Sequence, residues 1–79
     1  MKTSEVNASL IGKRVEGIAF GEIVTGIVTA VEITDCSAIV SFDYDTPQNW
    51  GGDLYHRGQN WARLHDEFGS LQYMRVINI

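Results

Sequence analysis

The strongest constraint on the fold is a two-residue alternation of apolar and polar side chains in the middle of the chain. Its apolar members are Ala38, Val40, Phe42 and Tyr44, and serine and aspartate fill most of the positions between them. Successive side chains of a strand point to opposite faces, so this pattern predicts a strand with one buried face. It does not fit a helix, whose apolar residues recur every three or four positions.

The surrounding segment, residues 13–44, is rich in valine, isoleucine and threonine and contains three glycines. β-branched residues favour strands, and glycines allow tight bends. The run from Ile23 to Ile33 is apolar on both sides, which predicts a long strand with a bulge or sharp bend at Gly26. Residues 34–37 then close a hairpin. We therefore predict a mainly β fold, a strongly bent antiparallel barrel of about five strands.

The other three segments carry different patterns. Residues 45–59 hold the single proline and three of the eight glycines, which predicts a long loop, and loops of this length are often functional. Residues 60–79 are predicted as a second hairpin with strands at 61–65 and 70–76, although a short helix capped by Asn60 competes. Residues 1–11 form either a helical turn or a frayed end.

The length of 79 residues fits one domain, residues 1–79, with a thin core. A chain this short buries only about 60% of the surface that its unfolded form exposes. Because its long strand is apolar on both sides, we expect a homodimer or a higher homo-oligomer. Cys36 is the single cysteine and allows no disulfide within the chain, and no signal peptide or membrane-spanning run is visible. A cytoplasmic location away from the membrane is therefore predicted.

Charge and motifs exclude several classes of function. Ten acidic against six basic residues give a formal net charge of −4, whereas proteins that bind a phosphate backbone gather lysine and arginine. Nucleic acid is therefore not expected as a partner. The histidines and the cysteine lack the short pair spacings of metal ligands, and no nucleophile motif is present. We predict no catalytic residue, no bound metal and no cofactor.

The candidate binding site is an aromatic and acidic cluster around the predicted loop. Aromatic faces attract cations, and carboxylates at the rim add negative potential. The cluster therefore predicts a surface for a protein partner or a cationic small ligand. Two alternatives stay open, since Trp61 also suits the core, and Trp50 with Tyr55 either is displayed or forms a lid on the core. The residues assigned to the site are Tyr44, Trp50, Tyr55, Trp61, Asp43, Asp45 and Asp53.

Three phrases, at residues 10–17, 26–31 and 38–43, carry a resemblance to a known superfamily. They read Leu-Ile-Gly-Lys-Arg-Val-Glu-Gly, Gly-Ile-Val-Thr-Ala-Val and Ala-Ile-Val-Ser-Phe-Asp. This resembles the opening of SH3-like small barrels, including Tudor-type modules, in which a first strand begins with a Gly-x-x-Val phrase, bends and runs into a strand pair. The resemblance covers about three quarters of the chain and implies a small binding or protein-interaction module, without fixing its ligand.

Residues 69–73, Gly-Ser-Leu-Gln-Tyr, are similar to a phrase of the small plasmid-encoded (type II) dihydrofolate reductases. Those SH3-like barrels form a tetramer around one active-site pore, and their Gly-Ser-Val-Gln-Ile-Tyr phrase holds folate and the nicotinamide cofactor. This resemblance implies an alternative function, a self-associating small-molecule enzyme in which Gln72 and Tyr73 meet across a symmetry axis. The sequence departs from that family because Met74 stands at its tyrosine position and no lysine follows Lys13.

Overall fold

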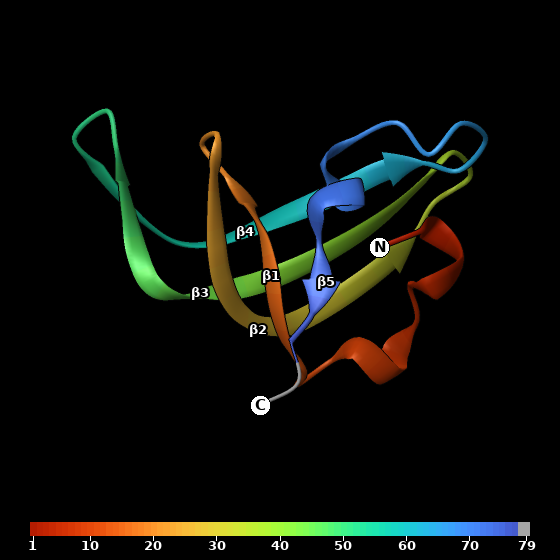
Figure 1. The fold of residues 1–79 in the computed structure, drawn as a ribbon, viewed down its shortest axis with the longest axis horizontal. Helices are drawn as coiled ribbons and strands as arrows, with labels where there is room; N and C mark the ends of the chain where they lie inside the picture. The colour runs from red at the N-terminus through yellow and green to blue at the C-terminus, as the bar shows by residue number, and fades with distance from the viewer. Residues whose placement is uncertain (78–79) are drawn as a thin grey trace.

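The computed structural model describes residues 1–77 and consists mainly of one antiparallel β-sheet (Figure 1). Its five strands follow the order β4-β3-β2-β1-β5, and the helices of the described part are short 3-10 turns. The predicted mainly β fold with five antiparallel strands is confirmed, but the sheet does not close, so the barrel is a loose one. The strands are β1 (Arg14–Ala19), β2 (Glu22–Ile33), β3 (Ser37–Trp50), β4 (Asp53–Arg63) and β5 (Arg75–Val76), and the turns are η1 (Thr3–Glu5), η2 (Ala8–Leu10) and η3 (Ser70–Tyr73).

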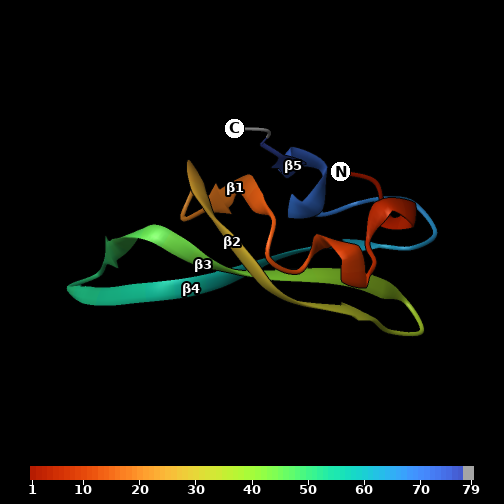
Figure 2. The same cartoon turned by 90° about the horizontal axis from the view of Figure 1, so that it is seen from below.

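One face of β3 forms the centre of the core. Ala38, Val40 and Phe42 are fully buried, as the alternation predicts, and Val24 and Val28 of β2 are buried in the same core. Figure 2 shows β1 and β5 lying over β3 and β4, with β2 crossing between them. The strong bend of β2 thus folds one sheet into two layers around these side chains. The other buried apolar residues are Val6, Leu10, Val15, Ala19, Ala62, Leu71 and Met74.

Gly26 lies where β2 approaches β3 most closely. A Cβ atom at this position would overlap the carbonyl oxygen of Asp43 and touch the ring of Phe42. The register of the β2–β3 pair shifts further along, between Val28 and Ala30. The predicted bulge is therefore present in β2 but not at Gly26, whose missing side chain permits the close backbone approach.

The side chain of Asn60 on β4 bridges to the part of β1 that β5 leaves unpaired. Its Oδ1 accepts a hydrogen bond from the backbone N–H of Ile18 at 3.0 Å, and its Nδ2 donates to the Ile18 carbonyl at 2.9 Å. The buried amide therefore satisfies both backbone groups of Ile18, as a neighbouring strand would. Gly17 leaves room for it, since a Cβ there would lie 2.5 Å from Asn60 Oδ1.

The prediction of a long loop at residues 45–59 is wrong. β3 continues to Trp50 and β4 begins at Asp53, so the segment is a hairpin around residues 51–52. Both of these glycines have positive φ, 61° and 87°, as a two-residue hairpin turn of the primed type requires. The strand pairing is interrupted around Pro47, which lacks the N–H group that a ladder needs.

The predicted hairpin at residues 60–79 is also wrong, and so is the competing helix. Strand structure stops at Arg63, a turn and η3 follow, and β5 pairs with β1 instead of β4. Gly69 helps to explain this path, because its φ is 143° and a Cβ there would overlap the Trp61 carbonyl oxygen. The chain therefore crosses the end of β4 closely instead of turning back beside it. The last part of that prediction, residues 78 and 79, lies outside the described residues.

The N-terminal segment, residues 1–11, folds as η1 and η2 and packs on the sheet. Val6 and Leu10 are buried in the core. The carboxylate of Glu67 accepts hydrogen bonds from the backbone N–H of Thr3, at 2.8 Å, and from its hydroxyl. These contacts join the segment to the turn after β4. Within residues 1–77 no helix has the length and apolarity needed to cross a membrane.

Candidate functional site

Two hairpin tips extend from the same end of the sheet (Figure 1). The pairing of β2 with β3 ends at Gly26 and Tyr44, and beyond this pair the β1–β2 and β3–β4 hairpins continue as separate arms. One arm ends in the turn at residues 20–21 and the other in the turn at residues 51–52. The topology thus brings together residues about 30 positions apart in the sequence, as expected for two neighbouring arms of a meander.

Three aromatic rings meet between these tips. The rings of Phe20 and Trp50 are stacked, with centroids 5.3 Å apart and an interplanar angle of 6°. Tyr55 packs against Phe20 with a centroid distance of 5.1 Å and a tilt of 49°. Trp50 is 57% exposed, Phe20 39% and Tyr55 38%. The structure therefore displays Trp50 and Tyr55, and neither is a lid on the core. We call the surface formed by Phe20, Trp50 and Tyr55 the aromatic tip.

Phe20 occupies a backbone conformation that suits glycine. Its φ is 52°, and with Gly21 at 79° it forms the two-residue turn between β1 and β2. Bulky residues rarely adopt positive φ, and the left-handed region is disfavoured by roughly 1–2 kcal/mol for residues with a Cβ. Sequence reasoning missed Phe20 because it extends the apolar run of Ile18 and Ala19. The available signal was the Phe-Gly pair between two strand-like runs, a hairpin turn with an unusual first residue.

Two acidic residues adjoin the aromatic tip in the chain or in the strand register. Asp53 is paired in register with Trp50 across the β3–β4 hairpin, so the two side chains share one face. Glu22 follows the Phe20–Gly21 turn and lines a groove between the arms. Among the salt bridges of residues 1–77, neither carboxylate takes part. The aromatic tip therefore carries uncompensated negative charge.

The other two predicted acids are held by arginines. Asp45 forms an ion pair with Arg14 and accepts a hydrogen bond from the Thr25 hydroxyl at 2.6 Å, which ties β1, β2 and β3 together where the arms diverge. Asp43 lies 3.6 Å from the guanidinium of Arg57. Asp45 is thus neutralised within the fold, whereas the exposed contact between Asp43 and Arg57 is a weak ion pair.

Tyr44 belongs to the rim of the core instead of the displayed surface. Its ring packs edge-on against Phe42 at 5.3 Å with an interplanar angle of 81°. Its hydroxyl lies against Gly58, where a Cβ would overlap it. Burial raises the pKa of Tyr44, so this phenol stays protonated and does not act as a base near neutral pH.

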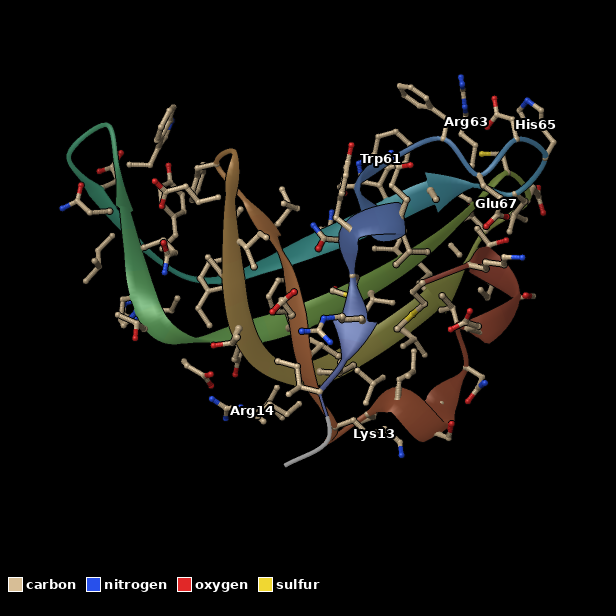
Figure 3. The ribbon with its side chains drawn as sticks, viewed as in Figure 1. Lys13, Arg14, Trp61, Arg63, His65 and Glu67 are labelled. Atoms are coloured by element: carbon tan, nitrogen blue, oxygen red, sulfur yellow. The ribbon has the colours of Figure 1, made fainter. Side chains whose placement is uncertain are left out.

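Trp61 is separated from the aromatic tip. It is 42% exposed, so it is not a core residue, and it lies six positions beyond Tyr55 on β4. At roughly 3.3 Å per residue this spacing is about 20 Å. Figure 3 places Trp61 with Arg63, His65 and Glu67 at the end of the molecule opposite the hairpin tips. The structure thus brings Trp50, Tyr55 and Asp53 together and leaves Trp61 apart from them.

The residues around the turn after β4 form hydrogen bonds that stabilise that turn. The backbone N–H of Phe68 lowers the pKa of Asp66, with Arg63 adding an ion pair at 2.7 Å. Hydrogen bonds from Thr3 lower the pKa of Glu67. These groups stay charged and lie at the surface, with His65 Nε2 3.5 Å from Asp66. No group of three potential ligands among histidine, cysteine, aspartate and glutamate is placed to hold a metal in the described part of the chain.

A groove of about 330 Å³ opens between the two arms next to the aromatic tip. Its volume is at the lower end of the range for ligand sites in proteins. Glu22 of the groove follows the Phe20–Gly21 turn, and Gln48 pairs in register with Tyr55, so the groove adjoins the aromatic tip and we take both as the candidate site. The groove is lined by Glu22, Ile23, Val24 and Thr25 of β2 and by Thr46 and Gln48 of β3.

The comparisons with known proteins identify one family. A family model described as a domain of unknown function (DUF7258) matches residues 1–76. No curated protein and no solved structure matches the chain. The match spans every strand and turn described above, so the family domain includes both arms and the aromatic tip.

Proposed function

Since this chain belongs to the DUF7258 family of domains of unknown function, we propose its role from the chemistry of its hairpin tips. It is a small binding module that holds a cationic group of a protein partner or small ligand against the aromatic tip. An ammonium or a guanidinium group fits this surface, because both are attracted to the faces of aromatic rings. Recognition, and not bond-making, is its chemistry.

The conformation of Phe20 is the observation that carries this proposal. Glycine, asparagine or aspartate would form the same turn with less strain. Backbone strain of this kind gathers at sites where it serves function. Phe20 holds Trp50 stacked and half-exposed, and three partly exposed rings at a strained turn support a ligand surface better than a contribution to stability.

Charge supports a cationic ligand. Glu22 adjoins the Phe20–Gly21 turn, Asp53 pairs in register with Trp50, and neither forms an ion pair within residues 1–77, while the chain as a whole has a net charge of −4. Carboxylates at the rim of an aromatic surface raise the local concentration of cations and speed their association. An anionic ligand would be repelled at the same place.

The remaining expectations from the sequence stay predictions. The single bent sheet of five antiparallel strands supports the SH3-like assignment. Ile23 and Ile33 of β2 are exposed, which supports self-association as a homodimer or larger oligomer. The reductase-like alternative requires Gln72 and Tyr73 to meet across a symmetry axis, and both are exposed on η3. We favour the binding module because the hairpin tips combine the positive φ of Phe20, the exposed stacked rings and two carboxylates that form no ion pair within residues 1–77.

A titration monitored by nuclear magnetic resonance tests the proposal. The probe is N-acetyl-arginine amide, and its neutral isostere N-acetyl-citrulline amide is the control ligand. We expect chemical-shift changes at Phe20, Gly21 and the Trp50 indole with the arginine probe and much smaller changes with citrulline. Replacing Trp50 by alanine should weaken binding about fivefold, the effect of losing a cation–π contact of about 1 kcal/mol at an exposed site.

The matched control variant is Trp61→Ala, which removes a partly exposed tryptophan of β4, far from the aromatic tip. It should bind the arginine probe as the wild type does. Equal binding of arginine and citrulline would refute a cation site. Equal weakening by Trp50→Ala and Trp61→Ala would refute the placement of the site.

A further inference from the structure

The groove between the arms exposes the edge of a strand. From Glu22 to Thr25, β2 pairs only with β1, because its pairing with β3 begins at Gly26. β3 is likewise paired only with β4 at its far end, where Gln48 faces Tyr55 in register. The groove thus separates two strands that would otherwise be neighbours in the sheet.

The direction of the backbone groups on this edge follows from the ladder. The N–H of Val28 donates to the Lys13 carbonyl on the β1 side at 3.0 Å. Backbone groups alternate in direction along an antiparallel strand, so Val24 and Glu22 also face β1. Both backbone groups of Ile23 and the N–H of Thr25 therefore face the groove without a partner on β3, whereas the Thr25 carbonyl takes part in the ladder that begins at the Gly26–Tyr44 pair.

We propose that the ligand is an extended peptide segment of a partner protein that adds to the free edge of β2 and places a basic side chain on the aromatic tip. This inference rests on the proposed function and names the class of its ligand. Strand addition draws affinity from main-chain hydrogen bonds and specificity from alternate side chains. The groove offers main-chain groups of Ile23 and Thr25 to the peptide backbone. Glu22 and the adjoining aromatic tip offer contacts to its side chains.

The dimensions and charges of the groove fit such a segment. The free edge spans four residues, from Glu22 to Thr25, or about 13 Å of extended chain at ~3.3 Å per residue. Its walls are mostly polar, with threonine and glutamine side chains that suit a peptide backbone. Glu22 and Asp53 form no ion pair within the described part of the chain, so a lysine or arginine of the segment supplies the counter-charge.

The first experiment compares peptides on the intact chain. The probe is acetyl-Thr-Val-Arg-Val-Thr-amide, and two further versions carry backbone N-methyl groups either on both valines or on the arginine alone. The unmethylated peptide should bind at least about tenfold more tightly than N-acetyl-arginine amide, since it adds main-chain hydrogen bonds. One methylated version should lose this gain and the other should keep it, because alternate N–H groups of a strand face opposite sides.

The second experiment changes the strand edge. Ile23→Pro removes an N–H that faces the groove and that β1 does not use, and proline is tolerated at such edge positions. The matched control is Ile33→Ala, which shortens another exposed isoleucine of β2 outside the groove and keeps every N–H. Ile23→Pro should weaken the peptide about tenfold and weaken N-acetyl-arginine amide much less, whereas Ile33→Ala should bind both nearly as the wild type does.

The outcomes separate this inference from the proposed function. If N-acetyl-arginine amide binds at the aromatic tip but the peptide binds no more tightly, or if both methylated peptides bind equally, strand addition is refuted and the cation site stands. If the arginine probe does not bind, the proposed function fails as well. If the amides of Ile23 and Thr25 become protected from exchange as the concentration of chain rises without peptide, the occupant is a second copy and the peptide proposal is overturned. The peptide comparison decides the matter even if Ile23→Pro does not fold.

Discussion

Replacing Asn60 by alanine is expected to destabilise the domain by about 2–4 kcal/mol. Asn60 is 2% exposed, and its amide satisfies the N–H and C=O of Ile18 and also donates to the Gln59 carbonyl at 3.1 Å. Alanine leaves the two Ile18 groups without these partners. Each partly buried orphan group costs about 1–2 kcal/mol. A domain of this size has a total stability of roughly 4–12 kcal/mol, so the loss is a large part of it.

The assay is urea unfolding followed by far-ultraviolet circular dichroism, with thermal unfolding beside it. The melting temperature should fall by about 8–32 °C, since 1 kcal/mol corresponds to roughly 4–8 °C in a domain of this length. The control is Gln59→Ala, an exposed neighbour on β4 whose change should stay within about 0.5 kcal/mol. A loss below about 1 kcal/mol for Asn60→Ala would refute the bridging role of this amide.

Gly17 gives an independent check of the same bridge. In the wild type, Gly17→Ala places a Cβ 2.5 Å from Asn60 Oδ1 and 2.9 Å from the Phe42 ring. In the Asn60→Ala background the first of these overlaps is gone, so Gly17→Ala should cost less there than in the wild type. Non-additivity of about 0.5–3 kcal/mol is typical for residues in contact. If the two changes in unfolding free energy simply add, residues 17 and 60 are not in steric contact.

Four further changes test the rest of the structure. Phe20→Asn should leave the unfolding free energy unchanged or raise it by up to about 1 kcal/mol, since relief of the positive φ offsets the lost stacking, while N-acetyl-arginine amide binding falls in the titration. Trp50→Ala should lower stability by only about 0.5–1.5 kcal/mol in urea, and a loss of 3–5 kcal/mol would show a buried tryptophan instead. Gly26→Ala should prevent native folding, visible as lost amide-signal dispersion, because its Cβ would overlap the Asp43 carbonyl. The pKa of Glu67 is lowered in the folded state, so its carboxylate stabilises the fold above the ordinary pKa of about 4.3. This stabilisation is lost as pH falls through the folded pKa. Glu67→Gln should therefore make the unfolding free energy, measured in urea, less dependent on pH below about pH 4.

The sequence pattern predicted those strands whose buried face is visible within one segment. The alternation at Val40 and Phe42 reports a buried face directly, and the strand and hairpin assignments up to Tyr44 agree with the structure. The hairpin at residues 45–59 was missed because proline and glycine are typical of loops as well as of hairpin turns. The two adjacent glycines at 51–52 are instead the turn that permits the strands to continue.

The candidate site was only partly accessible to sequence reasoning. Trp50, Tyr55 and Asp53 were found because aromatic and acidic residues are close together in the chain. Phe20 was not, since its contact with Trp50 depends on how two hairpins lie in space. The bridge from Asn60 to Ile18 is hidden for the same reason, because no periodicity within one segment reports a pairing between segments 42 positions apart.

The strand order also predicts the sequence of events during folding. β1, β2, β3 and β4 each pair with a neighbour in the chain through short turns, so these hairpins close small loops at low entropic cost. β5 pairs with β1 across almost the whole chain, and we expect it to dock last. During synthesis the edge of β1 that faces β5, at Arg14 and Glu16, therefore stays open until β5 has emerged, and in this interval nascent chains are most exposed to edge-to-edge association.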